Sequence, residues 1–99
     1  MTRLADFARV VRSKNAGPTL VTIDVLFADA RSLERALPAF DAAAIARLYG
    51  LSPQEIKVIP YVPALAIKVV MPRRLVAGEP GDRDVYGAQQ HAPLLGLQV

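Results

Sequence analysis

Two polar segments, far apart along the chain, hold most of the side chains that could perform chemistry. The first contributes Arg12, Ser13, Lys14, Asn15 and Gly17, and the second contributes Asp84, Tyr86, Gln89, Gln90 and His91. An arginine can pair with both oxygens of a carboxylate, and a lysine adds a compact positive charge. Side-chain amides can orient a carbonyl or hydroxyl group. These residue types therefore favour a binding site for a small anion.

Acid–base catalysis has two candidate residues in the second segment. His91 is the sole histidine of the chain, and Tyr86 lies five positions before it. Either side chain could transfer a proton if a substrate lay within hydrogen-bond reach. The simpler alternatives stay open: a lone histidine is more often a packing residue, and residues 12–17 could form a solvated turn in which Asn15 and Gly17 provide permissive backbone conformations.

Several other chemistries lack the residues that they need. With no cysteine, the chain has neither a disulfide nor a zinc–thiolate site, and a metal site built on its one histidine would need carboxylates. Asp82 and Asp84 stand in a segment typical of a solvated loop. The glycines match neither a phosphate-binding loop nor a dinucleotide fingerprint. We therefore expect no metal and no cofactor.

The composition indicates a single folded domain over residues 1–99. Hydrophobic residues make up 53% of the chain and charged residues 21%, so one core can form. The net charge of +3 comes from basic residues spread along the chain, unlike the concentrated basic face of a nucleic-acid binder. No apolar run reaches membrane-spanning length, and the first residues lack a signal-peptide core. We expect a soluble, cytoplasmic protein that binds neither nucleic acid nor membrane.

The N-terminal half predicts one helix or short strand, one clear strand and a broken helical region. Residues 3–12 have apolar residues at helical spacing, although a short strand over residues 9–12 competes. Residues 19–27 alternate with period two, as a strand does. Helical residues 33–40 are interrupted by Pro38, and Asp41 then caps a second stretch that ends at Gly50.

The C-terminal half predicts three strands and one helix. Residues 56–62 should form an edge strand because Pro60 cannot donate a ladder hydrogen bond. A strand over residues 65–71, a helix over residues 85–91 and a closing strand over residues 95–99 follow. The resulting order predicts an α+β fold of ferredoxin-like βαββαβ type, with a four-stranded antiparallel sheet in the order 4-1-3-2 and both helices on one face. Residues 1–18 would be an N-terminal extension and polar loop.

This topology would bring the two polar segments to one end of the sheet. It also gives the sheet a second face of mixed character, which carries Leu20, Thr22, Asp24, Leu26, Lys57, Ile59, Tyr61, Lys68, Val70 and Gln98. Asp24 and Lys68 lie on neighbouring predicted strands, where they could pair. An apolar patch of this kind indicates a partner surface. Residues 3–11, a second copy of the chain or a different subunit could cover it.

Two long motifs, residues 12–17 (RSKNAG) and residues 84–93 (DVYGAQQHAP), carry a resemblance to a known family. Together with LYGL and PALAIKVVMPR, they resemble a family of small bacterial and archaeal proteins described as domain of unknown function DUF4387. Members are often encoded beside acyclic terpene utilisation (AtuA-like) proteins. A fainter similarity is to the small ferredoxin-fold domain attached to those larger proteins. The resemblance implies a helper subunit in catabolism of carboxylic acids or their CoA thioesters, without established catalytic residues.

Three functions remain open at this point. The first is an accessory or ligand-binding subunit that partners a larger enzyme of carboxylic acid, CoA-thioester or terpenoid catabolism, or that forms a homo-oligomer. The second is a small stand-alone hydratase, isomerase or lyase, with His91 or Tyr86 as acid–base and Arg12 with Lys14 holding a carboxylate. The third is a regulatory module that senses a small anion.

Overall fold

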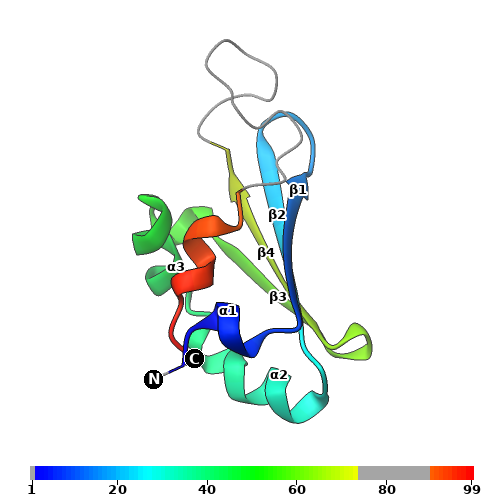
Figure 1. The fold of residues 1–99 in the computed structure, drawn as a ribbon. Helices are drawn as coiled ribbons and strands as arrows, with labels where there is room; N and C mark the ends of the chain where they lie inside the picture. The colour runs from blue at the N-terminus through cyan, green and yellow to red at the C-terminus, as the bar shows by residue number, and fades with distance from the viewer. Residues whose placement is uncertain (1, 74–89) are drawn as a thin grey trace.

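One layer of short helices lies against a single sheet in the computed structural model, which describes residues 2–73 and 90–99 (Figure 1). The elements in chain order are α1 (Leu4–Phe7), β1 (Val10–Asn15), β2 (Leu20–Leu26), α2 (Ala30–Ala36), the 3-10 turn η1 (Leu37–Ala39), α3 (Ala42–Tyr49), η2 (Pro53–Glu55), β3 (Lys57–Tyr61), η3 (Val62–Ala64), β4 (Ala66–Pro72) and η4 (Ala92–Gly96).

The four strands form one antiparallel sheet in the order β1-β2-β4-β3. The α+β class with a four-stranded antiparallel sheet is thus confirmed, whereas the ferredoxin-like order is not. The neighbours β2, β4 and β3 follow the predicted arrangement, including Pro60 on an edge strand. Beside β2, however, the position expected for the closing strand is occupied by β1.

Two predictions about the ends of the chain are wrong. Residues 12–15 belong to strand β1 rather than to a polar loop, because a tight turn at Gly17, with φ of 90°, folds β1 directly back on β2. Residues 92–96 form a 3-10 helix rather than part of a strand, with Pro93 in its first turn. A single bridge between Arg3 and Gln98 replaces the expected closing ladder. The helix expected over residues 85–91 lies largely outside the described residues.

The helical region between β2 and β3 follows its sequence signals closely. Pro38 converts the end of α2 into the 3-10 turn η1, and Asp41 then caps α3 by accepting from the Ala43 N–H. Gly50 ends α3 in the left-handed conformation, with φ of 68°. Ser52 and Glu55 form the capping box of η2. Local backbone chemistry therefore fixes this part of the fold.

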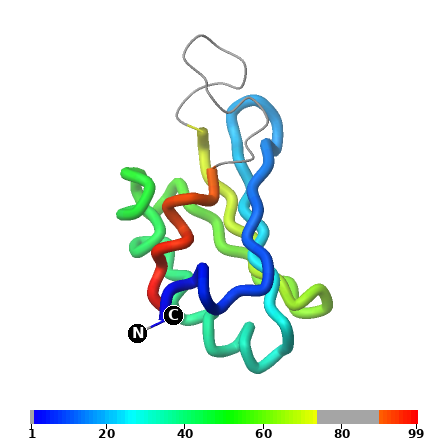
Figure 2. The backbone as a smooth tube through the Cα atoms, viewed as in Figure 1, coloured from blue at the N-terminus to red at the C-terminus, as the bar shows by residue number. Residues whose placement is uncertain are grey.

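The hydrophobic core lies between the helices and one face of the sheet. Odd-numbered residues of β2 and β4 point into it, and Ile23, Ile67 and Val69 are fully buried. Leu4 and Leu94 are also fully buried, so α1 and η4 complete the cover. The two ends of the chain lie side by side, as Figure 2 shows. They are joined by bonds from Leu4 N to Leu97 O (2.7 Å) and from Val99 N to Thr2 O (2.9 Å).

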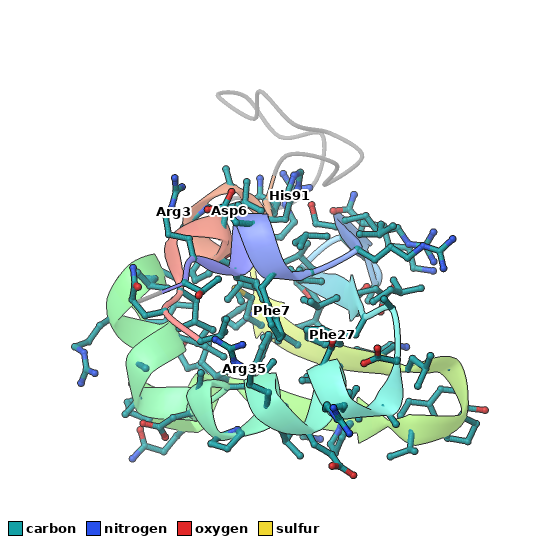
Figure 3. The ribbon with its side chains drawn as sticks, turned by 60° about the horizontal axis from the view of Figure 1, so that its bottom comes forward. Arg3, Asp6, Phe7, Phe27, Arg35 and His91 are labelled. Atoms are coloured by element: carbon teal, nitrogen blue, oxygen red, sulfur yellow. The ribbon has the colours of Figure 1, made fainter. Side chains whose placement is uncertain are left out.

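An aromatic contact fixes α1 against the end of β2 and against α2 (Figure 3). The Phe7 and Phe27 ring centroids are 6.2 Å apart, with a tilted angle of 59° between the rings. The Arg35 guanidinium carbon lies 4.8 Å above the Phe7 ring centroid, within the range of a cation–π contact. These contacts hold the N-terminal segment on the helical side of the sheet.

Candidate functional site

A contact between Ser13 and His91 joins the two polar segments that the sequence singles out. Ser13 lies in β1 on the core face and is only 9% exposed. Its Oγ accepts a hydrogen bond from the His91 backbone N–H at 3.2 Å and lies 3.3 Å from His91 Nδ1. Residues separated by 78 positions are thus held together by one hydroxyl group.

Further polar contacts stand at the same end of the sheet. Arg73 donates through Nη1 to Asn15 Oδ1, which links the residue after β4 to the end of β1. The Tyr49 hydroxyl, at the end of α3, donates to the Gln90 carbonyl oxygen at 2.8 Å. Burial raises the pKa of Tyr49 well above its ordinary value of 10.0, so this hydroxyl remains a donor at neutral pH. We call Ser13, Asn15, Tyr49, Arg73, Gln90 and His91 the polar clamp.

The polar clamp has the geometry of a tether rather than of a nucleophile and its base. The Ser13 hydroxyl is nearly buried, and one of its lone pairs already accepts the His91 N–H. An attacking hydroxyl needs open access to a substrate carbon, together with a base that takes its proton. Here the same contacts close the end of the core around residues 90 and 91.

The predicted anion site is divided between the two faces of the sheet. Consecutive strand residues point to opposite faces, so Ser13 and Asn15 face the core while Arg12 and Lys14 face away from it. Gly17 lies in the turn after β1, with no atom within 4 Å of the position that a Cβ would take. Three further candidates lie outside the described residues: Asp84, Tyr86 and Gln89. Whether Lys14 lies near Tyr86 therefore stays a prediction.

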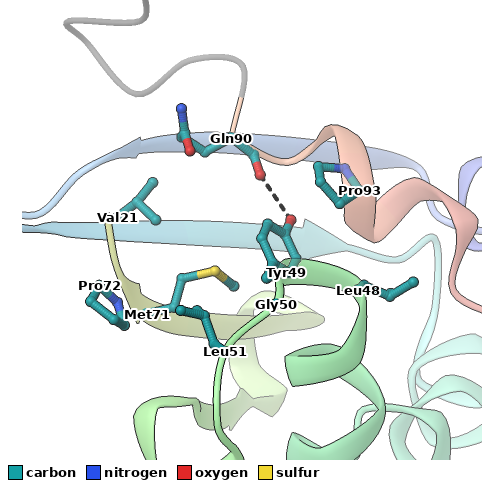
Figure 4. A pocket seen from close by; sticks show the side chains of 9 residues that line it. All are labelled: Val21, Leu48, Tyr49, Gly50, Leu51, Met71, Pro72, Gln90 and Pro93. Carbon is teal, nitrogen blue, oxygen red and sulfur yellow. Dashed lines mark hydrogen bonds between the residues drawn. The ribbon is translucent and has the colours of Figure 1, made fainter. Parts of the chain in front are cut away.

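A cavity of about 390 Å³ lies beside the polar clamp, between the end of α3 and the ends of β2 and β4 (Figure 4). Its walls are largely apolar and include Val21, Leu51 and Met71. The polar groups at its rim are Gln90 and the Tyr49 hydroxyl, and that hydroxyl already donates to the Gln90 carbonyl. The cavity therefore offers apolar contacts and few unused donors.

The opposite sheet face carries a mixed apolar and charged surface, which we call the open face. Val10, Leu20, Ile59 and Tyr61 are 39%, 39%, 46% and 59% exposed on it. The cross-strand register places Arg12 beside Asp24 and Asp24 beside Lys68, so these three side chains form one charged row. No described element packs over this face. The mixed composition and the cross-strand neighbours Asp24 and Lys68 are as predicted, whereas Gln98 belongs to the C-terminal bridge.

A groove of about 420 Å³ crosses the open face. Its apolar part includes Leu26, Ile59 and Ala66. Its charged lining consists of Arg12, Asp24 and Lys68. The groove thus combines a hydrophobic floor with two cations and one carboxylate, which leaves an excess of positive charge. These are features of a binding surface.

The comparisons with known proteins show one family. The family model described as Domain of unknown function (DUF4387) matches residues 4–98. The chain belongs to the DUF4387 family. Neither a curated protein nor a solved structure matches it.

Two features are absent from the described part of the DUF4387 chain: a cluster of metal-binding side chains and a membrane-spanning helix. Residues 2–73 and 90–99 contain no group of three or more histidine, cysteine, aspartate or glutamate side chains placed to hold a metal ion. Over the same residues, every helix is too short or too polar for a membrane crossing.

Sequence reasoning missed two members of the polar clamp in this DUF4387 chain. For Tyr49 the sequence predicted only a position at the end of a helix. Its hydrogen bond to Gln90 was missed because the two residues are 41 positions apart. Arg73 formed a basic pair with Arg74 in the sequence, without a sign that it reaches Asn15. Both partnerships arise from the tertiary fold, and a single sequence gives no local pattern for them.

Proposed function

We propose that this DUF4387 protein is a non-catalytic accessory subunit that binds a larger protein through its open face. The observation that carries the proposal is the concentration of exposed apolar side chains there. Ile59 and Tyr61 are 46% and 59% exposed on adjacent outward positions of β3, and Val62, in the turn that follows, is 58% exposed. Exposed apolar patches on small proteins often mark protein–protein contact sites.

The geometry of the polar clamp supports a binding role over a catalytic one. Ser13 and His91 contact each other within the polar clamp. Arg12 and Lys14, which were predicted to hold a carboxylate, point to the opposite face of the sheet. A stand-alone hydratase, isomerase or lyase would need an acid–base group and an anion-binding group around one substrate. Among the described residues, His91 contacts the core face of β1, whereas Arg12 and Lys14 stand on its other face.

The resemblance to proteins encoded beside AtuA-like proteins suggests the class of partner. We propose a larger cytoplasmic enzyme of carboxylic acid, CoA-thioester or terpenoid catabolism. The accessory subunit would extend that enzyme's surface with a preformed sheet. A preformed interface loses little conformational entropy on binding, which favours affinity.

Co-expression with an AtuA-like protein, the kind of large protein encoded beside family members, tests this proposal when the mass of the native complex is measured. A complex of defined stoichiometry is expected for the unmodified chain. Ile59→Asp should abolish it by placing a charge in the apolar patch. Leu48→Asp is the matched control, because Leu48 is 40% exposed on α3, on the helical side. Recovery of the free monomer from the wild-type co-expression contradicts the proposal.

A further inference from the structure

We infer that the groove on the open face recognises an acidic, apolar segment of another protein, with one apolar side chain in the groove and a carboxylate beside it. This inference rests on the open face being the docking surface of the proposed function. It adds the chemistry of the occupant, which follows from the way charge and hydrophobic area are arranged across the four strands.

The apolar part of the groove is one row of the antiparallel register. Leu26 pairs with Ala66, which in turn pairs with Tyr61, so these three side chains stand in line across the sheet. The small Ala66 between two larger neighbours leaves a depression within the groove of about 420 Å³. Tyrosine and arginine at such a position are the residue types that most often dominate binding energy. An apolar side chain of the partner fits this row.

The charged row lies directly beside the apolar one. Arg12, Asp24 and Lys68 are register partners in neighbouring strands. Asp24 stands two residues along from Leu26, and Lys68 two residues along from Ala66. Side chains two apart on a strand are separated by roughly 7 Å. In the described structure no ion pair within 4.0 Å is formed by Asp24 with either cation. Both cations therefore remain available to an incoming carboxylate.

The excess of positive charge on the open face favours a negatively charged partner. Within the described strands, the outward positions of this face carry four basic side chains, Arg12, Lys14, Lys57 and Lys68, against the single carboxylate of Asp24. A second copy packed face to face would set like charge against like charge, which is unfavourable at an interface. An acidic partner surface gains from the same arrangement, and electrostatic attraction also speeds its association.

The required spacing can be tested with short peptides that do not depend on the identity of the partner. In an extended peptide Glu-Ser-Leu-Ser-Glu, the leucine and both glutamates share one side, and each glutamate lies about 7 Å from the leucine. The probes are this blocked peptide, a version with leucine replaced by serine, and a version with both glutamates replaced by lysine. Amide chemical shifts of the isotope-labelled full-length protein report where each probe binds.

The acidic leucine peptide should shift the amides of Leu26, Ala66 and Lys68 in a saturable way. Each altered peptide should bind at least about tenfold more weakly, because one of the two recognition elements is missing. The double variant Arg12→Glu/Lys68→Glu should lose binding. Arg31→Glu/Arg47→Glu is the matched control, since it makes the same charge change at exposed positions of α2 and α3 and should leave binding intact.

Four results would overturn the inference. They are equal binding of the lysine peptide, shifts confined to the cavity beside Tyr49, shifts that depend on protein concentration without peptide, and binding to phosphatidylserine vesicles but to no peptide. The third result would identify a second copy as the occupant. If the co-expression experiment yields a complex and any of these results is also obtained, the proposed function is supported. Only the inference about the chemistry of the groove is then contradicted.

Discussion

The two faces of the sheet are made by alternate residues of the same strands, yet they serve different purposes. In β2, Val21, Ile23 and Val25 are at most 1% exposed, while Leu20, on the other face, is 39% exposed. The core face is closed by helices and by the polar clamp. The open face keeps large apolar side chains in contact with solvent. A side chain's contribution to stability should therefore depend on its face more than on its type.

The largest expected effect comes from a matched pair of isoleucines on opposite faces. Ile23→Ala removes a fully buried side chain and should lower the free energy of unfolding by about 2–5 kcal/mol. Ile59→Ala, at a position that is 46% exposed, should change it by no more than about 1 kcal/mol. Urea denaturation followed by circular dichroism measures both. Equal losses would mean that the open face is part of the folding core.

The polar clamp gives the next largest effect. Ser13→Ala leaves the His91 N–H without the hydroxyl that accepts its bond, and should cost about 1–3 kcal/mol. His91→Ala keeps that backbone bond and loses only the contact to Nδ1, so it should cost less. Chemical denaturation of the two variants in parallel checks the order. A larger loss from His91→Ala would make the imidazole, and not the backbone, the anchor of residues 90 and 91.

Tyr49→Phe should cost about 1 kcal/mol at neutral pH, since it removes the hydrogen bond to the Gln90 carbonyl. Burial raises the pKa of Tyr49 in the folded state, so the unfolded chain ionises first as the pH passes 10.0. The folded state then binds more protons than the unfolded state, and stability falls with rising pH. Denaturation between pH 8 and 11 should show a shallower alkaline loss for Tyr49→Phe than for the wild type.

The smallest effect concerns a polar atom on the open face. Thr22 is 7% exposed, and its Oγ1 is buried without a hydrogen-bond partner. Its register neighbours are Lys14 and Val70. Thr22→Val should therefore stabilise the free protein by up to about 1 kcal/mol, because it removes an unpaired buried hydroxyl. Thermal denaturation that shows a clear loss would mean that the hydroxyl has a partner in solution.

The sequence was most informative where local chemistry decides the structure. The caps at Asp41 and Gly50, the break at Pro38 and the edge position of Pro60 were all predictable, because each depends on a few neighbouring residues. The identity of the strand beside β2 was not predictable in this way. The β1 hairpin and the expected closing strand compete for the same edge of β2, and Pro93 with the burial of Leu94 decides the outcome through tertiary packing.

The candidate site was predictable only in part for the same reason. The joining of residues 12–15 to residues 90–91 followed from the expectation that both lie at one end of the sheet, and Ser13 does contact His91. A short strand over residues 9–12 was one of two alternatives, and its continuation to residue 15 was not predicted. Consequently, Arg12 and Lys14 were grouped with residues that point to the other face.

Oxidative footprinting of the complex with the neighbouring large protein tests the central claim most directly. Hydroxyl radicals label accessible side chains, and mass spectrometry compares the labelling of the free and bound chain. The open face should become protected at Ile59 and Tyr61, while Leu48 on the helical side keeps its free-state labelling. Protection of Leu48 with Tyr61 still fully labelled would contradict the claim that this protein binds through its open face.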